Sequence, residues 1–207
     1  MIRAKHHFFI YPFFQWFTLF LLKRKFHRIK IIGAFIDESK PILVIANHIS
    51  WWDGFWLEYI NLKMLHRKFH FMMLEEQLRK HWYFNYTGGY SVKKNSKSIM
   101  ETLNYTSELL NVTSNMVFIF PQGKINSMHN HQIQFERGVD RIIKNCSREV
   151  QILFVANFIE YLSNSKPSLY MYIKSADKSI PDFQLLENEY NAFYHSALQN
   201  QQLISDQ

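Results

Sequence analysis

The sequence predicts an α/β fold, in which helices flank a mixed and mainly parallel sheet. Several short runs, such as PILVIA (41–46) and QILFVANFI (151–159), are almost entirely apolar, which is typical of strands buried on both faces. These runs alternate along the chain with stretches of helical character, as in sheets whose faces are covered by helices. Hydrophobic residues make up 47% of the 207 residues, which is enough for the core of one domain.

The N-terminal stretch FFIYPFFQWFTLFLL (8–22) is apolar apart from Gln15 and Thr18 and is 15 residues long. A helix that spans a bilayer needs about 20 apolar residues, so this one is too short to cross comfortably. The basic stretch KRKFHRIK (23–30) follows directly. We therefore expect residues 1–30 to form a membrane-associating segment with an interfacial helix, interrupted near Pro12 and Gln15, and residues 31–207 to form the α/β domain. A buried helix of a soluble protein is the alternative.

The remaining elements follow from apolar patterning and from turn residues. PILVIA precedes Ser50, which we expect to cap a helix that starts at Trp51. Pro121 and Gly123 end the run MVFIF (116–120). The expected strands cover residues 28–37, 41–46, 69–74, a short piece within 88–94, 116–120, 151–159 and 168–175. The further helices expected cover residues 75–84, 96–111, 138–147 and 181–203.

Two polar clusters follow predicted strands. His48 comes just after the strand at 41–46, and the stretch PQGK (121–124) follows the strand at 116–120. In α/β sheets, ligands bind beyond the carboxyl ends of the strands. The two clusters are therefore expected at one edge of the sheet and in one pocket.

His48 and Asp53 form a candidate catalytic pair. On one continuous helix a spacing of five would point the two side chains in different directions. Because His48 precedes the expected cap and Asp53 lies in the first helical turn, the aspartate can reach back to the imidazole. A neutral imidazole removes a proton from a hydroxyl, and a carboxylate on its second nitrogen fixes the tautomer. No nucleophile elbow accompanies the pair, so the hydroxyl should belong to a substrate.

The net charge of the chain indicates which kinds of partner it can bind. The formal charge of +7 would suit nucleic acid, anionic lipid or phosphate-bearing substrates. The basic residues cluster beside the apolar N-terminus and no nucleic-acid motif is present, so we expect a membrane surface and no nucleic acid. Cys146, the only cysteine, excludes an intrachain disulfide and a cysteine-rich metal site. HNH (129–131) lacks a third ligand and His66/His70 lie in a basic stretch, so we expect no metal.

Three blocks in this order, NHISWWD, FIFPQGKI and QFERG, resemble the lysophospholipid acyltransferase family, typified by bacterial 1-acylglycerol-3-phosphate acyltransferases. The resemblance covers about residues 28–160. It implies that His48 is the general base and that Asp53 supports it. It also implies that substrate is bound at positions that match the family's later blocks, which are a Gly…Arg segment that aligns with GGYSVKK (88–94) and the blocks FIFPQGKI and QFERG. The positions are Lys94, Phe120, Pro121, Gln122, Gly123, Lys124, Arg137 and Gly138.

The sequence departs from the family pattern near the acceptor. Gln122 replaces the usual glutamate, Lys124 and Ile125 replace a Thr-Arg pair, and Lys94 stands where the family has arginine. A lysine holds phosphate as a point charge, without the bidentate fork of arginine. The acceptor therefore stays open between a glycerophosphate and a glycolipid, an aminolipid or another hydroxyl or amine.

The function implied by the resemblance is transfer of a fatty acyl group from a thioester to a lipid hydroxyl. The donor would be acyl-CoA or acyl-carrier protein, used as co-substrate, and no bound cofactor is expected. Backbone N–H groups near Gly123 or Trp51 are candidates to stabilise the oxyanion. The enzyme is expected at the cytoplasmic face of the cell membrane, peripheral or monotopic. The alternative is a catalytically silent lipid-binding protein of the same fold.

Overall fold

The computed structural model describes residues 1–93, 98–177 and 182–205. It contains one seven-stranded sheet with the order β1-β7-β6-β2-β5-β3-β4. All neighbouring strands are parallel except β6 and β7, which are antiparallel. The strands are β1 (Arg28–Ile32), β2 (Ile42–Ala46), β3 (Lys68–Leu74), β4 (Gly89–Val92), β5 (Asn115–Ile119), β6 (Gln151–Glu160) and β7 (Ser168–Ser175). The predicted mixed, mainly parallel sheet is confirmed.

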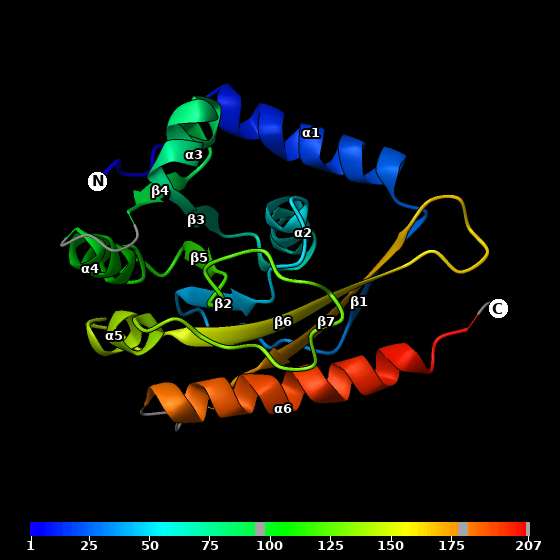
Figure 1. Ribbon diagram of the computed structural model, residues 1–207. Helices are drawn as coiled ribbons and strands as arrows, with labels where there is room; N and C mark the ends of the chain where they lie inside the picture. The colour runs from blue at the N-terminus through cyan, green and yellow to red at the C-terminus, as the bar shows by residue number, and fades with distance from the viewer. Residues whose placement is uncertain (94–97, 178–181, 206–207) are drawn as a thin grey trace.

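Helices cover both faces of this sheet. Figure 1 shows α1 and α2 on one face and α5 and α6 on the opposite face. The helices are α1 (Ile10–Lys25), α2 (Asp53–Ile60), the π-helix η1 (Asn61–Leu65), α3 (Glu75–Lys80), the 3₁₀ helix η2 (Trp82–Tyr86), α4 (Ile99–Leu109), α5 (Val139–Lys144) and α6 (Phe183–Gln202). The sheet thus divides the apolar core into two clusters, one under the helices of each face.

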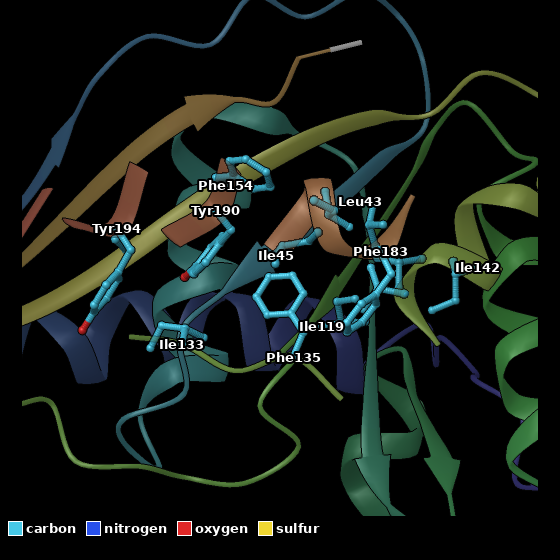
Figure 2. Packing of buried hydrophobic residues seen from close by; sticks show 14 of the residues in the cluster. Leu43, Ile45, Ile119, Ile133, Phe135, Ile142, Phe154, Phe183, Tyr190 and Tyr194 are labelled. Atoms are coloured by element: carbon cyan, nitrogen blue, oxygen red, sulfur yellow. The ribbon is translucent and has the colours of Figure 1, made fainter. Parts of the chain in front are cut away.

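Strand β2 lies at the centre and is buried at every position. Leu43 and Ile45 point into the cluster under α4, α5 and α6, where Figure 2 shows them beside Phe135, Phe154 and Tyr190. The alternate residues of β2 point into the second cluster, under α1 and α2. This alternation explains why the strand is a continuous apolar run in the sequence.

Several element boundaries differ from the predictions, and the predicted starts of the helices at 96–111 and 181–203 lie outside the described residues. Strand β1 ends at Ile32 rather than at residue 37, because Gly33 has φ +118° and a Cβ there would lie 2.2 Å from the Ile173 carbonyl oxygen. Helix α2 starts at Asp53 rather than at Trp51, and the Ser50 hydroxyl accepts the Trp52 N–H without capping the helix. The segment expected as one helix at 75–84 is divided into α3 and η2.

Helix α1 continues through Pro12 and Gln15 and includes the first basic residues, up to Lys25. Pro12 lies in the first turn, where its missing N–H has no helical partner to lose. Ahead of the helix, residues 1–7 lie along β4 and η2, where Ile2 and Ser91 exchange hydrogen bonds and His7 N–H donates to the Tyr86 carbonyl. The division of the chain at residue 30 stays a prediction.

Candidate functional site

The site lies at the carboxyl ends of β2 and β5. These strands are parallel neighbours, and Ile45 pairs with Ile119. Three residues beyond each, His48 and Gln122 meet, and the His48 N–H donates to the Gln122 side-chain oxygen at 2.6 Å. The pairing of the two strands therefore brings the two polar clusters together at one edge of the sheet, as the sequence predicts.

The imidazole of His48 is hydrogen bonded to Asp53, with 2.6 Å between Nδ1 and Oδ2. The same carboxylate oxygen accepts the backbone N–H groups of Ile49 and Ser50 at 2.7 and 2.9 Å. The His48 ring stacks on Phe120, with 4.1 Å between ring centroids. Because Oδ2 acts as the acceptor, Nδ1 carries the proton and Nε2 is the nitrogen that can act as a base.

The Asp53 side chain is completely buried at the first residue of α2. Burial raises the pKa of this carboxyl, while the hydrogen bonds from His48, Ser50 and Ile49 oppose the rise. The positive end of the α2 helix dipole also favours the ionised form. The carboxylate is therefore placed to stabilise a positive charge on the His48 ring.

A cavity of about 610 Å³ opens beside the imidazole. Most of its wall is apolar and comes from α1, α2 and β3 on one side and from α4 and α5 on the other. Several predicted site residues line it together: His48, Phe120, Pro121, Gly123, Lys124, Arg137 and Gly138. Asp53 and Gln122 are buried behind the His48 loop and do not line the cavity. Asp53 contacts the imidazole ring of His48, and Gln122 contacts its backbone N–H. Lys94 lies outside the described residues.

The PQGK turn is fastened to its surroundings by backbone hydrogen bonds. The Gly123 N–H donates to the Phe120 carbonyl, and the Glu136 N–H donates to the Pro121 carbonyl at 2.7 Å. Gly123 has φ +63°, and a Cβ there would lie 2.5 Å from the Glu136 carboxyl. Glu136, which the sequence reasoning missed, lines the same cavity. The only feature of the sequence that could have pointed to Glu136 is that it directly precedes Arg137, a predicted site residue.

The sequence of the chain matches the profile of a family described as Acyltransferase over residues 23–157. The chain belongs to the acyltransferase family. Its fold is similar to that of the crystal structure of the 1-acyl-sn-glycerophosphate (LPA) acyltransferase, PlsC, from Thermotoga maritima, with a TM-score of 0.70. The two chains are 16% identical, and the match covers 95% of this chain and 81% of that chain. None of the curated proteins matches the chain.

In this acyltransferase, Asn47, the residue before His48, connects two strands of the sheet. Its side-chain oxygen accepts the Asn157 N–H at 2.7 Å, and its amide donates to the Asn157 carbonyl at 3.0 Å. The two bonds fasten the end of β2 to β6. Asn47 therefore fixes the backbone from which His48 projects. This role can be recognised only from the tertiary structure.

A second carboxyl of the acyltransferase lines the cavity and was not predicted. Glu58 of α2 is buried, and its two oxygens accept the amides of Gln15 on α1 and Asn61 on η1 at 3.2 and 3.1 Å. Burial raises the pKa of Glu58 to about 7, although both amide donors oppose the rise. Only the packing of α1 on α2 makes this carboxyl a buried group.

The remaining histidines do not assemble a metal centre in the part of the chain that the structure describes. There, no group of three or more His, Cys, Asp or Glu side chains could hold a metal ion. His129 and His131 are exposed in a loop. His70 is buried in β3 beside the ring of His6, with 4.8 Å between centroids, and is not part of a solvated surface. Its burial lowers the pKa of His70 to about 4.

Among the described residues of the acyltransferase, no helix has the length and apolar content needed to cross a bilayer. Helix α1 and its N-cap residue instead expose a row of aromatic side chains at helical spacing: Phe9, which is the N-cap, then Phe13, Trp16 and Phe20. Figure 1 shows that α1 lies on the outside of the molecule, over α2.

Proposed function

We propose that this acyltransferase moves a fatty acyl group from acyl-CoA or acyl-carrier protein to the hydroxyl of a glycerophosphate-type or other lipid acceptor, with His48 as general base. The observation that carries the proposal is that His48, hydrogen bonded to the buried Asp53, lines a large and mainly apolar cavity. Nδ1 is committed to Asp53, so Nε2 is the atom that receives the hydroxyl proton.

The reaction would proceed through a tetrahedral intermediate. As Nε2 removes the proton, the acceptor oxygen bonds to the thioester carbonyl carbon, and the carbonyl oxygen takes up negative charge. Collapse breaks the carbon–sulfur bond, and the thiolate leaves with the proton that His48 returns. Asp53 stabilises the imidazolium between the two transfers. The Gly123 N–H already donates to the Phe120 carbonyl. The Trp51 N–H is therefore the better of the two candidate donors to stabilise the oxyanion.

The cations at the cavity support an acceptor that carries a phosphate. Lys124 and Arg137 both line the cavity that His48 faces. The guanidinium of Arg137 lies over the Phe183 ring at 4.7 Å, which orients it beside the cavity. We assign acceptor-phosphate binding to these two side chains. Gln122 has a different role, because its buried side chain supports the His48 backbone.

The aromatic row of α1 supports association with a membrane, where the lipid acceptor resides. Aromatic side chains favour the membrane–water interface, and Lys23, Arg24 and Lys25 in the last turn of α1 would contact anionic headgroups. We therefore place the enzyme at the cytoplasmic face of the membrane as a peripheral or monotopic protein.

Acyl transfer to 1-acylglycerol-3-phosphate by Arg137→Ala tests the assignment of the acceptor site. Loss of a charge-assisted contact to phosphate should raise the KM for the acceptor by about tenfold or more, while the KM for the thioester changes little. Arg141→Ala, an exposed arginine on the next helix, is the matched control and should behave like the wild type. An unchanged acceptor KM in Arg137→Ala would remove this residue from the site.

A wild-type protein that binds lipid without acyl transfer would favour the lipid-binding alternative.

A further inference from the structure

We propose that a second cleft, at the carboxyl end of α1, binds the phosphate headgroup of an anionic phospholipid in the bilayer. The cleft has a volume of about 300 Å³ and lies between α1, the start of β1 and the α2–η1 junction. None of the residues assigned above to catalysis or acceptor binding lines it. The site is therefore separate from the cavity beside His48.

Three cations from three different segments surround this cleft. Lys23 belongs to the last turn of α1, Arg28 begins β1, and Lys63 belongs to η1. All three side chains are exposed, and in the described part of the chain none of them forms a salt bridge with a carboxylate. Cations that converge without an acidic partner provide a site for a phosphate group.

The rest of the cleft suits the apolar part of a lipid. Leu19, Phe26 and Tyr59 contribute to its wall, and the Lys63 ammonium lies 5.8 Å from the centroid of the Tyr59 ring. A purely ionic phosphate site would not need this apolar lining. An amphipathic ligand, with a charged head and hydrocarbon next to it, matches both parts.

The cleft is continuous with the proposed membrane face of α1. Phe13, Trp16 and Phe20 follow one another at steps of three and four residues, and Lys23 comes three residues later on the same side of the helix. An interfacial helix buries its apolar face only about 5–10 Å into the headgroup and acyl boundary. Lys23 and the cleft would then lie at the level of the lipid phosphates.

The α1 helix itself repels an anion at this end. The carboxyl end of a helix carries partial negative charge, which disfavours phosphate. Lys23, Arg24 and Lys25 in the last turn offset that charge. Binding of a phosphate here therefore requires the additional cations from β1 and η1, which is why we assign the site to the convergence of all three segments.

Vesicle binding by the full-length chain tests this site, which rests on the membrane association proposed above. The probes are vesicles of phosphatidylcholine alone and of phosphatidylcholine mixed with phosphatidylglycerol. Wild type should bind the anionic vesicles more tightly. The triple variant Lys23→Ala, Arg28→Ala and Lys63→Ala should lose on the order of 10- to 100-fold in affinity for them, since each cation at a membrane surface contributes substantially. Its weaker binding to phosphatidylcholine should be unchanged.

A matched triple variant removes the same number of charges from the opposite side of the molecule. Arg141, Lys144 and Lys174 are exposed. Arg141 and Lys144 belong to α5, which lies across the sheet from α1 (Figure 1), and Lys174 forms an ion pair with Glu189 of α6 on that same face. Charges farther than about 8 Å from the lipid are largely screened at physiological salt, so this variant should lose less than about threefold. Equal losses in the two triple variants would show a general effect of net charge and overturn the site.

Two further outcomes separate the explanations. Release of the wild type by inorganic phosphate, compared with chloride at equal ionic strength, would identify free phosphate as the ligand and overturn the lipid assignment. Equal binding of wild type to both kinds of vesicle would overturn the headgroup site but leave the membrane association standing. Binding to neither kind would overturn both. Acyl transfer in neutral detergent micelles should be the same in wild type and in both triple variants, which tests the acyltransferase proposal separately.

Discussion

At the scale of single residues, one carboxylate oxygen determines how His48 can act. Oδ2 of Asp53 accepts the Nδ1 proton of His48 and two backbone N–H groups of the loop between them. These bonds fix both the position of the loop and the tautomer of the ring. Asp53 thus combines a structural role in the loop with an electrostatic role in proton transfer.

Asp53→Asn should separate these two roles. The amide still has an oxygen that can accept backbone N–H groups, but it carries no charge and cannot stabilise the imidazolium as the carboxylate does. We expect kcat to fall on the order of 10²–10⁴-fold with little change in the KM values. Steady-state kinetics at saturating donor and acceptor measure this. Activity within about twofold of the wild type would show that Asp53 only supports the loop.

Glu58 should make the stability of the protein depend on pH. Its folded pKa is raised to about 7 from the ordinary value of 4.5, because burial disfavours the ionised form. The favourable contribution of the protonated carboxyl is fully present below about pH 4.5 and is lost as the pH rises through about 7. The total loss is about 3 kcal/mol.

Glu58→Gln removes the ionisation and should keep the contacts with α1 and η1 after a flip of the Gln15 amide. The variant should therefore exceed the wild type in free energy of unfolding by about 3 kcal/mol near pH 8, and by less than about 1 kcal/mol near pH 5. Denaturant titrations at the two pH values give both differences. The same difference at both values would mean that Glu58 binds no more protons in the folded than in the unfolded protein over this range, so that its folded pKa is not raised.

Residue-level prediction from the sequence worked where the partners are close in the chain. His48 and Asp53 are five residues apart, at a junction between strand and helix, so their meeting could be inferred from local geometry. Asn47 and Glu58 depend on Asn157 and Gln15, which are distant in the sequence. No local pattern identifies such partners, and these two roles became visible only in the structure.

At the scale of elements, apolar runs located the strands and indicated a mainly parallel sheet, but they did not predict the order of the strands or which pair is antiparallel. The central strands are buried on both faces and therefore stand out in the sequence. The antiparallel pairing of β6 with β7, and the position of β1 beside β7, arise from contacts between distant segments. The ends of elements were predicted less well, because single backbone features such as the positive φ of Gly33 decide them.

The turn after β5 depends on Gly123. An alanine there would have to adopt φ near +63° and would bring its Cβ against the Glu136 carboxyl. We expect Gly123→Ala to lower the free energy of unfolding by about 1–2 kcal/mol. It should also reduce kcat, because the turn places Gln122 under the His48 backbone. Thermal denaturation and steady-state kinetics measure the two effects.

Gly54→Ala is the matched control for stability. Gly54 lies in helix α2, and a Cβ there would be in ordinary contact, 3.9 Å from the Phe118 ring. Because alanine favours helix, this variant should be as stable as the wild type or more stable by about 0.5–1 kcal/mol. A Gly123→Ala protein as stable as Gly54→Ala would show that the turn adapts without strain.

At the scale of the whole molecule, the sheet separates two sets of helices, and one set includes the helix proposed to contact the membrane. One face carries α4, α5 and α6 over an apolar core, part of which also lines the cavity, and the other carries α1 and α2 (Figures 1 and 2). The cavity starts at the carboxyl edge of the sheet, where His48 lies, and continues between α1, α2 and β3. The helix proposed to contact the membrane is thus also a wall of the cavity, which would give a lipid a short path from the bilayer to the imidazole.

The central claim is that the His48 imidazole takes the acceptor proton in acyl transfer. It is tested most directly by the rate of acyl transfer from acyl-CoA or acyl-carrier protein to 1-acylglycerol-3-phosphate, measured for purified wild type and for His48→Ala of equal thermal stability. We predict transfer by the wild type and a loss on the order of 10²–10⁴-fold in the variant. Transfer by His48→Ala at the wild-type rate would contradict the claim.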